Sequence, residues 1–473
     1  MKIALINPPY LHIYGPDKLA AHSHFSLGLG YIASMLKKNS PHSVKIFDPE
    51  AEGISLEVLA KRLRDESPDL VGITCFTPSF NSAVKIGRIA KDNTKAKVIL
   101  GGIHASSMPD EILEKYPEFD LLVIGEGEDT VMELCELLDT GKCDLSGVKG
   151  IAYRKDGRII KTPPREYITD LDALPFPARE LVDMGWYKPN DFSSRGKRSA
   201  SMITSRGCPH YCIHCASHLT LGRRFRAHSA DYVVREIEHL VKDCNIEHIF
   251  LKDDTFTYDQ ERAKDICRRI IDKKLRFEWT CLSRVNTVSL ELLKLMKKAG
   301  CFCISYGVES GDEQVLKNLK KGATLEQARN AVKMTNLAGI KSQCTFMLGN
   351  PGDTRDTINK TINFACELDP VVSIFFILTP YPGTEAHAIY MKGKKEHPAW
   401  DLFVISSGNP IIELEGLDKK TLKALITKAH LKFYMRPKQL FRLILRISDF
   451  NELKAYVRGA LGLCKRLLRL SCQ

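Results

Sequence analysis

The first 145 residues alternate between short apolar runs and segments with helical periodicity. Runs rich in Val, Ile and Leu cover residues 2–7, 44–48, 70–76, 97–102 and 121–126. Amphipathic patterns such as LGYIASMLKK and SLEVLAKRLRDE lie between them. Continuous apolar strands that alternate with amphipathic helices are typical of a parallel sheet covered on both faces. The pattern predicts an α/β, Rossmann-like domain over residues 1–145, with its ligand at the carboxyl ends of the strands.

A second alternation of strands and helices begins at residue 199. Candidate strands cover residues 199–205, 246–254, 276–283, 301–309, 340–349 and 371–380, and helical patterns follow the first five. Repeats of this kind predict a partial, six-strand βα barrel of the TIM type over residues 199–395, with its chemistry at the C-terminal ends of the strands. Residues 146–198 are interpreted as a linker, because Pro, Asp and Ser interrupt any periodicity there. Residues 396–473 are expected to form a helical, basic C-terminal region.

The positive charge of the chain is concentrated near its end. The formal net charge is +12, and residues 436–469 contribute +7 of it, from nine Lys or Arg against two acids. Such a local segment argues against a nucleic-acid footprint, so no nucleic-acid partner is expected. The leucine-rich basic tail fits two interpretations, an amphipathic helix at a membrane surface or a helical pair packed over the barrel.

The sequence contains no recognisable targeting segment, because Asn7, Pro8 and Pro9 end the first apolar run early. The longest apolar stretch, around residues 371–378, is much shorter than the roughly 18 residues that span a bilayer. We therefore expect a cytoplasmic protein that is at most peripheral at the inner face of the membrane. In that compartment the 15 cysteines indicate metal binding or chemistry rather than a disulfide framework.

Glycine-rich loops follow two strands of the first domain. Gly101, Gly102 and His104 follow the fourth strand, and Gly125, Glu126 and Gly127 follow the fifth. Glycine lets a backbone approach a ligand closely, although tight turns of an α/β fold would use it equally well. Neither loop has the G-x-G-x-x-G pattern with a following acid, so a nicotinamide or flavin fingerprint is absent.

Three cysteines follow the first strand of the second domain. Cys208, Cys212 and Cys215 have the spacing C-x-x-x-C-x-x-C, with no fourth cysteine nearby. Three thiolates can hold three irons of a [4Fe–4S] cluster and leave the fourth iron for an outside ligand. A zinc site is the alternative, with a histidine as the fourth ligand (His210, His214 or His218).

This cysteine spacing after the first strand of a βα barrel resembles the radical S-adenosylmethionine (SAM) enzymes. YGVESG (306–311), FMLGNPGDT (346–354) and TPYPGTE (379–385) look like the later strand motifs of that barrel. GGIHAS with GEGEDT is similar to the cobalamin-binding domain that precedes the barrel in one subgroup, which includes class B methylases and the anaerobic magnesium-protoporphyrin ester cyclase. The resemblance covers about residues 1 to 390. It implies three cofactors, namely a [4Fe–4S] cluster, SAM and cobalamin, and an electron donor of the flavodoxin or ferredoxin type.

The resemblance also implies roles for individual residues. The three cysteines would ligate the cluster, and the amino and carboxylate groups of SAM would chelate the open iron. Glu309 would contact the SAM ribose or amino group. The other expected SAM-side residues are Gly307, Gly349, Asp254 and Arg284. Arg284 would pair with the SAM carboxylate or else be a solvated arginine, and Asp254 stands where the family has a glycine-rich motif.

Cobalamin is expected at the loops that contain Gly101, Gly102, Gly125, Glu126 and Gly127. Cobalamin enzymes with a histidine ligand to cobalt carry D-x-H-x-x-G in the first βα loop, and this chain has Asn7-Pro8-Pro9 there. We therefore expect cobalamin to bind without a protein ligand to the metal. His104 would be a wall residue of the pocket or a structural histidine.

The leading functional hypothesis is radical methylation of an unactivated carbon in a small-molecule substrate that is apolar or lipid-like. The first alternative is radical cyclisation or rearrangement without methyl transfer. Methylthiolation of RNA or protein would need three further cysteines for a second cluster, and Cys75, Cys135 and Cys143 lie at irregular sites. A non-enzymatic cobalamin carrier would need no cysteine loop.

Overall fold

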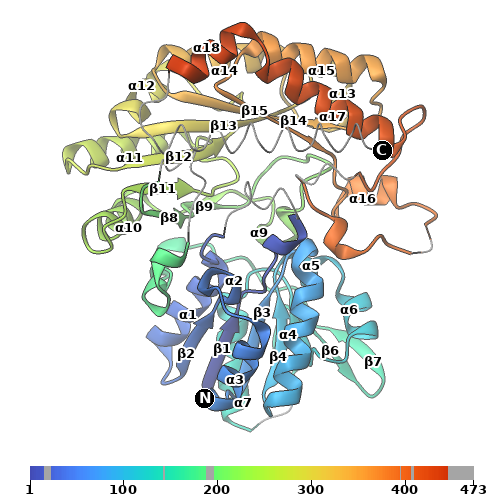
Figure 1. Cartoon of the computed structure of the whole chain (residues 1–473). Helices are drawn as coiled ribbons and strands as arrows, with labels where there is room; N and C mark the ends of the chain where they lie inside the picture. The colour runs from blue at the N-terminus through green and yellow to red at the C-terminus, as the bar shows by residue number, and fades with distance from the viewer. Residues whose placement is uncertain (15–22, 142–143, 188–195, 395, 406–409, 446–473) are drawn as a thin grey trace.

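The computed structural model describes residues 1–14, 23–141, 144–187, 196–394, 396–405 and 410–445 (Figure 1). Two α/β units make up this part of the chain. The first contains a seven-stranded sheet of order β2-β1-β3-β4-β5-β6-β7, and the second contains a six-stranded sheet of order β15-β14-β13-β12-β11-β8. Both predicted fold classes are confirmed.

The first sheet has five parallel strands with helices between them. Its strands are β1 (Lys2–Ile6), β2 (Ser43–Phe47), β3 (Leu70–Thr74), β4 (Lys97–Gly101) and β5 (Leu121–Val123). The helices are α1 (Leu27–Asn39), α2 (Pro49–Glu52), α3 (Leu56–Glu66), α4 (Phe80–Asn93), α5 (Ile103–Ser107), α6 (Pro109–Lys115) and α7 (Glu128–Asp139). The strand order changes direction between β1 and β3, and ligands of such folds bind at this point, outside the carboxyl ends of the strands.

The sheet of the first unit extends beyond the boundary predicted at residue 145. Strands β6 (Ile151–Lys155) and β7 (Arg158–Lys161) lie inside the predicted linker, and β6 pairs antiparallel with β5. Asp156 and Gly157 connect β6 to β7 with positive φ angles of 50° and 73°. An Asp-Gly pair between two strands is a strong hairpin pattern, so the sequence contained the information for this hairpin.

The second sheet is entirely parallel. Its strands are β8 (Ser199–Met202), β11 (His248–Leu251), β12 (Glu278–Ser283), β13 (Cys301–Glu309), β14 (Lys341–Leu348) and β15 (Val372–Ile377). A short antiparallel pair, β9 (Ser205–Arg206) with β10 (Arg226–Ala227), and helix α9 (His218–Leu221) flank the cysteine loop. All six predicted strands of the barrel are confirmed.

Helices cover one face of the second sheet, and its other face is turned toward the first unit (Figure 1). These helices are α10 (Ala230–Lys242), α11 (Gln260–Asp272), α12 (Leu290–Lys298), α13 (Glu313–Asn318), α14 (Leu325–Leu337) and α15 (Arg355–Leu368). Side chains alternate between the two faces of a strand. On β11, Ile249 and Leu251 are buried in the helix-covered core, whereas Phe250 lies 5.5 Å from the ring of His24 in the first unit.

The described C-terminal region is helical, with α16 (Glu385–Tyr390), α17 (Lys419–Tyr434) and α18 (Pro437–Leu445). Helix α17 packs against β15 and α15. The side chain of Arg436 bonds to Asp369 at 3.0 Å, and buried Gln439 donates to the Val371 carbonyl. The basic tail beyond residue 445 lies outside the described residues. No helix in the described ranges combines the length and apolarity needed to cross a membrane.

Candidate active site

The cysteine loop leaves the barrel through a turn that only glycine can make. Gly207 has a φ of 84°, and a Cβ at this position would clash with the Arg224 carbonyl oxygen. The Cys208 amide donates to the Gly222 carbonyl at 3.3 Å, and the Cys215 amide donates to the Cys212 carbonyl at 3.1 Å. All three cysteines are partly exposed. The fold therefore brings the predicted ligands together on one loop at the C-terminal end of β8.

Two neighbouring carboxylates hold the ends of this segment. The fully buried Asp253 accepts hydrogen bonds from the Thr204 amide (2.6 Å) and the Ser205 hydroxyl (2.7 Å), which fixes the chain just before the cysteines. Asp254 accepts from the Ser217 hydroxyl at 2.6 Å, just after them. Burial raises the pKa of Asp254. The predicted SAM-side residue Asp254 thus lies beside the loop.

A buried group of charges faces the same loop. Arg284 lies with Nη1 3.6 Å from the sulfur of Cys212 and donates through Nη2 to the Lys321 carbonyl. The Lys321 ammonium is 2.8 Å from a carboxylate oxygen of Glu309. All three side chains are nearly inaccessible to solvent. The solvated alternative for Arg284 is therefore wrong, and Lys321 is a residue of the site that the sequence reasoning missed.

Glu309 has the backbone geometry of a functional residue. Its φ is 70°, a strained value for a residue with a side chain. A Cβ on Gly307 would meet the carboxylate of Glu309 and lie 2.8 Å from the Lys321 ammonium, so a side chain there would displace this ion pair. Burial alone would raise the pKa of Glu309, but Lys321, His214 and Arg284 outweigh it and lower the pKa. Glu309 is consequently a buried carboxylate held in its charged form.

Several buried polar atoms around the loop lack a partner within the described part of the chain. They are Glu309 Oε2, Arg284 Nε, His214 Nδ1 and Asn350 Oδ1. Buried polar groups in proteins are nearly always hydrogen-bonded, so a polar ligand such as SAM fits this group of atoms. Gly349, another predicted SAM-side residue, directly precedes Asn350. It lies against the side chain of Ile412, and its carbonyl accepts from the Tyr390 hydroxyl at 2.9 Å.

Burial keeps two thiols of the loop protonated in the absence of a metal. Burial raises the pKa of Cys208, and it raises the pKa of Cys215 to about 11. A coordinating metal deprotonates a thiol outright, so these cysteines need the metal to become thiolates. Burial also lowers the pKa of His214 to about 4. In the described ranges no three His, Cys, Asp or Glu side chains are arranged as ligands of one metal ion.

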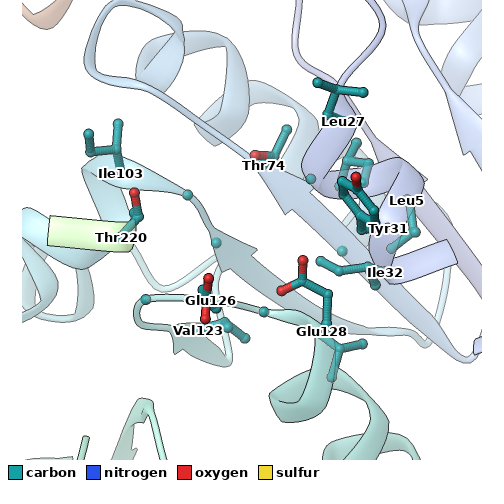
Figure 2. Close-up of a pocket in the computed structure, with 18 of the residues that line it drawn as sticks. Leu5, Leu27, Tyr31, Ile32, Thr74, Ile103, Val123, Glu126, Glu128 and Thr220 are labelled. Atoms are coloured by element: carbon teal, nitrogen blue, oxygen red, sulfur yellow. The ribbon is translucent and has the colours of Figure 1, made fainter. Parts of the chain in front are cut away.

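A second site lies at the carboxyl ends of β1, β3, β4 and β5. A cavity of about 250 Å³ opens there. Leu5, Tyr31 and Ile32 lie on one side of it and Ile103 and Thr220 on the other (Figure 2). The predicted cobalamin residues that line it are Gly101, Gly102, Gly125, Glu126 and Gly127. Small-molecule sites commonly measure about 300–1,000 Å³, so the cavity can hold only part of a corrinoid.

The backbone shape of the cavity depends on its glycines. Gly102 has a φ of 95°, and a Cβ there would meet the Cys75 carbonyl oxygen. Gly125 has a φ of 81°, and a Cβ there would have no atom within 4 Å. The space in front of Gly125 is therefore open to a ligand, whereas Gly102 is required by the fold itself.

Glu126 belongs to a buried ion network that joins the two units. Its carboxylate lies 3.0 Å from Arg206 and 2.9 Å from Arg226, and Glu128 lies 2.6 Å from Arg206. All four side chains are at most 5 % exposed. Arg206 also lies over the ring of Tyr31 and lines the cavity, two residues before Cys208. The sequence reasoning identified Glu126 but missed Glu128 and both arginines.

His104 does not take the position predicted for a pocket wall. It is fully buried, its Nδ1 lies 3.2 Å from the Thr77 hydroxyl, and its ring contacts Phe80 and Trp400. Burial lowers the pKa of His104 to about 3. The cavity lining does not include it, so the structural alternative describes this histidine. Helix α5 carries the side chain away from the strand ends.

Comparison with known proteins identifies both units. Residues 202–365 match the model of the radical SAM superfamily, and residues 19–135 match that of the B12 binding domain. The chain is 35% identical to an uncharacterized methyltransferase of Pyrococcus horikoshii over 98% of each chain. It is 28% identical to the anaerobic magnesium-protoporphyrin IX monomethyl ester cyclase of Rubrivivax gelatinosus, over 92% of this chain and 78% of that one.

The solved structure of the radical S-adenosylmethionine methyltransferase TsrM of Kitasatospora setae has the same fold, with a TM-score of 0.69. It is 21% identical, and the match covers 84% of this chain and 76% of that one. A [4Fe–4S] cluster, SAM and cobalamin are accordingly the cofactors of this enzyme, and the iron–sulfur prediction is confirmed over the zinc alternative. The chain belongs to the radical SAM enzymes that carry a cobalamin-binding domain.

Proposed function

We propose that this enzyme transfers a methyl group to an unactivated carbon of an apolar or lipid-like small molecule. The observation that supports it is the position of Arg206, which lines the cobalamin cavity and precedes the cluster ligand Cys208 by two residues. The two cofactor sites are thereby held next to one another. When bound, the cofactors supply a carbon-centred radical and a transferable methyl group.

The residues of the chain would position the reactants. The three cysteines bind iron, Arg284 pairs with the SAM carboxylate as a bidentate cation, and Glu309 accepts from the ribose or the amino group. Lys321 keeps Glu309 ionised. An external flavodoxin or ferredoxin supplies the electron. The face of the sheet that lacks helices carries exposed Leu282 and Ile374 (43% and 37%), which suits an apolar substrate.

Product analysis tests this proposal against radical cyclisation, which the relationship to the ester cyclase favours. Anaerobic enzyme with reductant, SAM and cobalamin would be given metabolite extract from a deletion strain. Methylation requires S-adenosylhomocysteine to appear together with 5′-deoxyadenosine. Cyclisation yields 5′-deoxyadenosine without S-adenosylhomocysteine, and that result would replace the proposed methyl transfer.

We propose peripheral membrane contact through the basic tail as a separate property of the chain. The supporting observation is its net +7 charge over residues 436–469, together with the exposed Phe441 near its start. Anionic lipid attracts such segments. The full-length protein should float with anionic liposomes, less so at high salt, and a chain ending near residue 430 should not. Equal flotation of the two proteins would assign the tail to packing.

A further inference from the structure

The strand register orders the side chains of the open face into rows. Leu251, the last residue of β11, pairs with Cys281, and Lys252 and Leu282 are the residues that follow this pair. Leu282 pairs with Ser305, and Ser305 pairs with Gln343. Leu282, Ser305 and Gln343 therefore form one row across β12, β13 and β14, and Lys252 continues it just past the end of β11.

The next row toward the cysteine loop contains the SAM-side residues. Two positions further along their strands, Asp254, Arg284 and Gly307 follow Lys252, Leu282 and Ser305. Side chains two positions apart share a face of a strand. Lys252 thus lies one row away from Arg284 and Asp254, which contact the cysteine loop at Cys212 and Ser217.

Lys252 is a cation with no anionic partner among the described residues. Its ammonium lies 5.0 Å from the centre of the Phe250 ring, and within the described residues it has neither an ion pair nor a side-chain hydrogen bond. The adjacent carboxylates accept hydrogen bonds from other residues. Asp253 accepts from Thr204 and Ser205, and Asp254 accepts from Ser217. Burial lowers the pKa of Lys252 to about 8.

An unpaired lysine in this position needs a physical reason. Lys252 is only partly exposed, and charged groups withdrawn from water are normally paired, as Lys321 is with Glu309 and Lys264 is with Glu261 and Glu291. An uncharged ligand would need no cation in this row. Gln343 already donates to Ser305 at 3.0 Å, and Leu282 offers an exposed apolar side chain. Replacing Lys252 by an aliphatic residue would then lower the cost of burial.

We propose that Lys252 binds an anionic group of the substrate, a carboxylate or a phosphate, while the apolar body of the substrate lies over Leu282 and Ile374. The inference rests on the proposed function, because it places the substrate on the open face of the sheet. It deepens that function by making the substrate an amphiphilic anion. The other source of such a group is the carboxylate of SAM, for which Arg284 is already available beside Cys212.

Binding of a simple amphiphilic anion tests the proposal without knowledge of the substrate. The probe is n-octyl phosphate, titrated calorimetrically into the full-length protein loaded anaerobically with cluster, cobalamin and SAM. Lys252→Met removes the charge, Lys252→Arg keeps it, and Lys294→Met removes an exposed charge from the outer helix α12 as a matched control. A charge-assisted hydrogen bond makes a difference of about tenfold or more in affinity.

We expect Lys252→Met to weaken octyl phosphate binding at least about tenfold, while Lys252→Arg and Lys294→Met change it little. Octyltrimethylammonium should bind poorly to all four proteins. Unchanged binding in Lys252→Met, or no binding to the unmodified protein, would overturn the inference. A loss of SAM affinity in Lys252→Met without a loss of octyl phosphate affinity would assign the site to SAM. Reductive SAM cleavage, measured in the same samples, reports the proposed function separately.

Discussion

Replacement of Glu126 by Gln tests whether the buried ion network holds the two units together. The substitution keeps the shape of the side chain and removes its charge. Arg226 then loses its carboxylate, since both oxygens of Glu126 lie within 3.0 Å of it. Arg206 keeps Glu128 at 2.6 Å. Glu126→Gln therefore leaves one buried guanidinium without a counter-charge.

The expected loss of stability is large because water cannot reach the orphaned charge. Arg226 and Glu126 are only 3 % and 5 % exposed. Breaking a buried ion pair by removing one partner costs about 3–5 kcal/mol. Arg226 retains hydrogen bonds to the carbonyls of Ile168 and Leu221, so we expect the lower end, about 3 kcal/mol.

Urea unfolding followed by circular dichroism measures this loss. The matched control is Asp231→Asn, which breaks the exposed pairs of Asp231 with Arg235 and Arg269 and should cost less than about 1 kcal/mol. A second variant, Glu126→Leu with Arg226→Met, removes both charges and should recover part of the stability. If Glu126→Gln costs no more than Asp231→Asn, the network does not stabilise the contact between the units and the argument is wrong.

Three further predictions concern the cofactor sites and pH. Cys212→Ala should abolish iron binding and reductive SAM cleavage, measured as iron content and 5′-deoxyadenosine; stoichiometric zinc with retained cleavage would contradict it. Gly125→Leu should block hydroxocobalamin binding in an absorbance titration, with a stability loss of about 1–2 kcal/mol. Gly102→Ala should instead mainly destabilise the fold, because its Cβ would clash with Cys75. Normal cobalamin binding by Gly125→Leu would refute the cavity assignment. Burial lowers the pKa of His104 from 6.5 to about 3, so below pH 6.5 the unfolded chain binds a proton at this histidine that the folded protein does not. The stability that neutral His104 contributes is therefore complete above pH 6.5 and is lost at about 1.4 kcal/mol per pH unit as the pH falls further. His104→Gln should flatten the urea stability curve between pH 6.5 and pH 5, and an unchanged slope would show that His104 is not its cause.

The features that the sequence predicted correctly are local in the chain. The strands could be located because each is a continuous apolar run, and the cysteine triplet because three ligands share one loop. The β6–β7 hairpin was missed although Asp156-Gly157 indicates it, since surrounding proline residues suggested a linker. The sequence left two roles open for His104, because its loop is rich in glycine and the direction of a side chain depends on the helix that follows.

The partners of the site residues could not be predicted, because they are distant in sequence. Glu126 meets Arg206 and Arg226, which lie 80 and 100 residues further along the chain. Lys321 reaches Glu309 only because helix α13 returns the chain to the end of β13. Such pairs need the three-dimensional arrangement of strands and helices, and neither residue type nor local spacing indicates them.

The run Lys252-Asp253-Asp254 shows why the face of each residue matters more than its type. If the alternation of β11 continues past its last residue, Lys252 and Asp254 lie on the open face and Asp253 lies opposite them, where it accepts from Thr204 and Ser205. A shift of the strand by one residue would exchange these roles, leaving a lone carboxylate on the open face and burying a lysine against the loop. The sequence alone does not determine this register, because the strand ends at Leu251, one residue before the charges begin. Pairing of Leu251 with Met202 and Cys281 determines it instead, so the chemistry of the open face follows from the apolar residues that align the sheet.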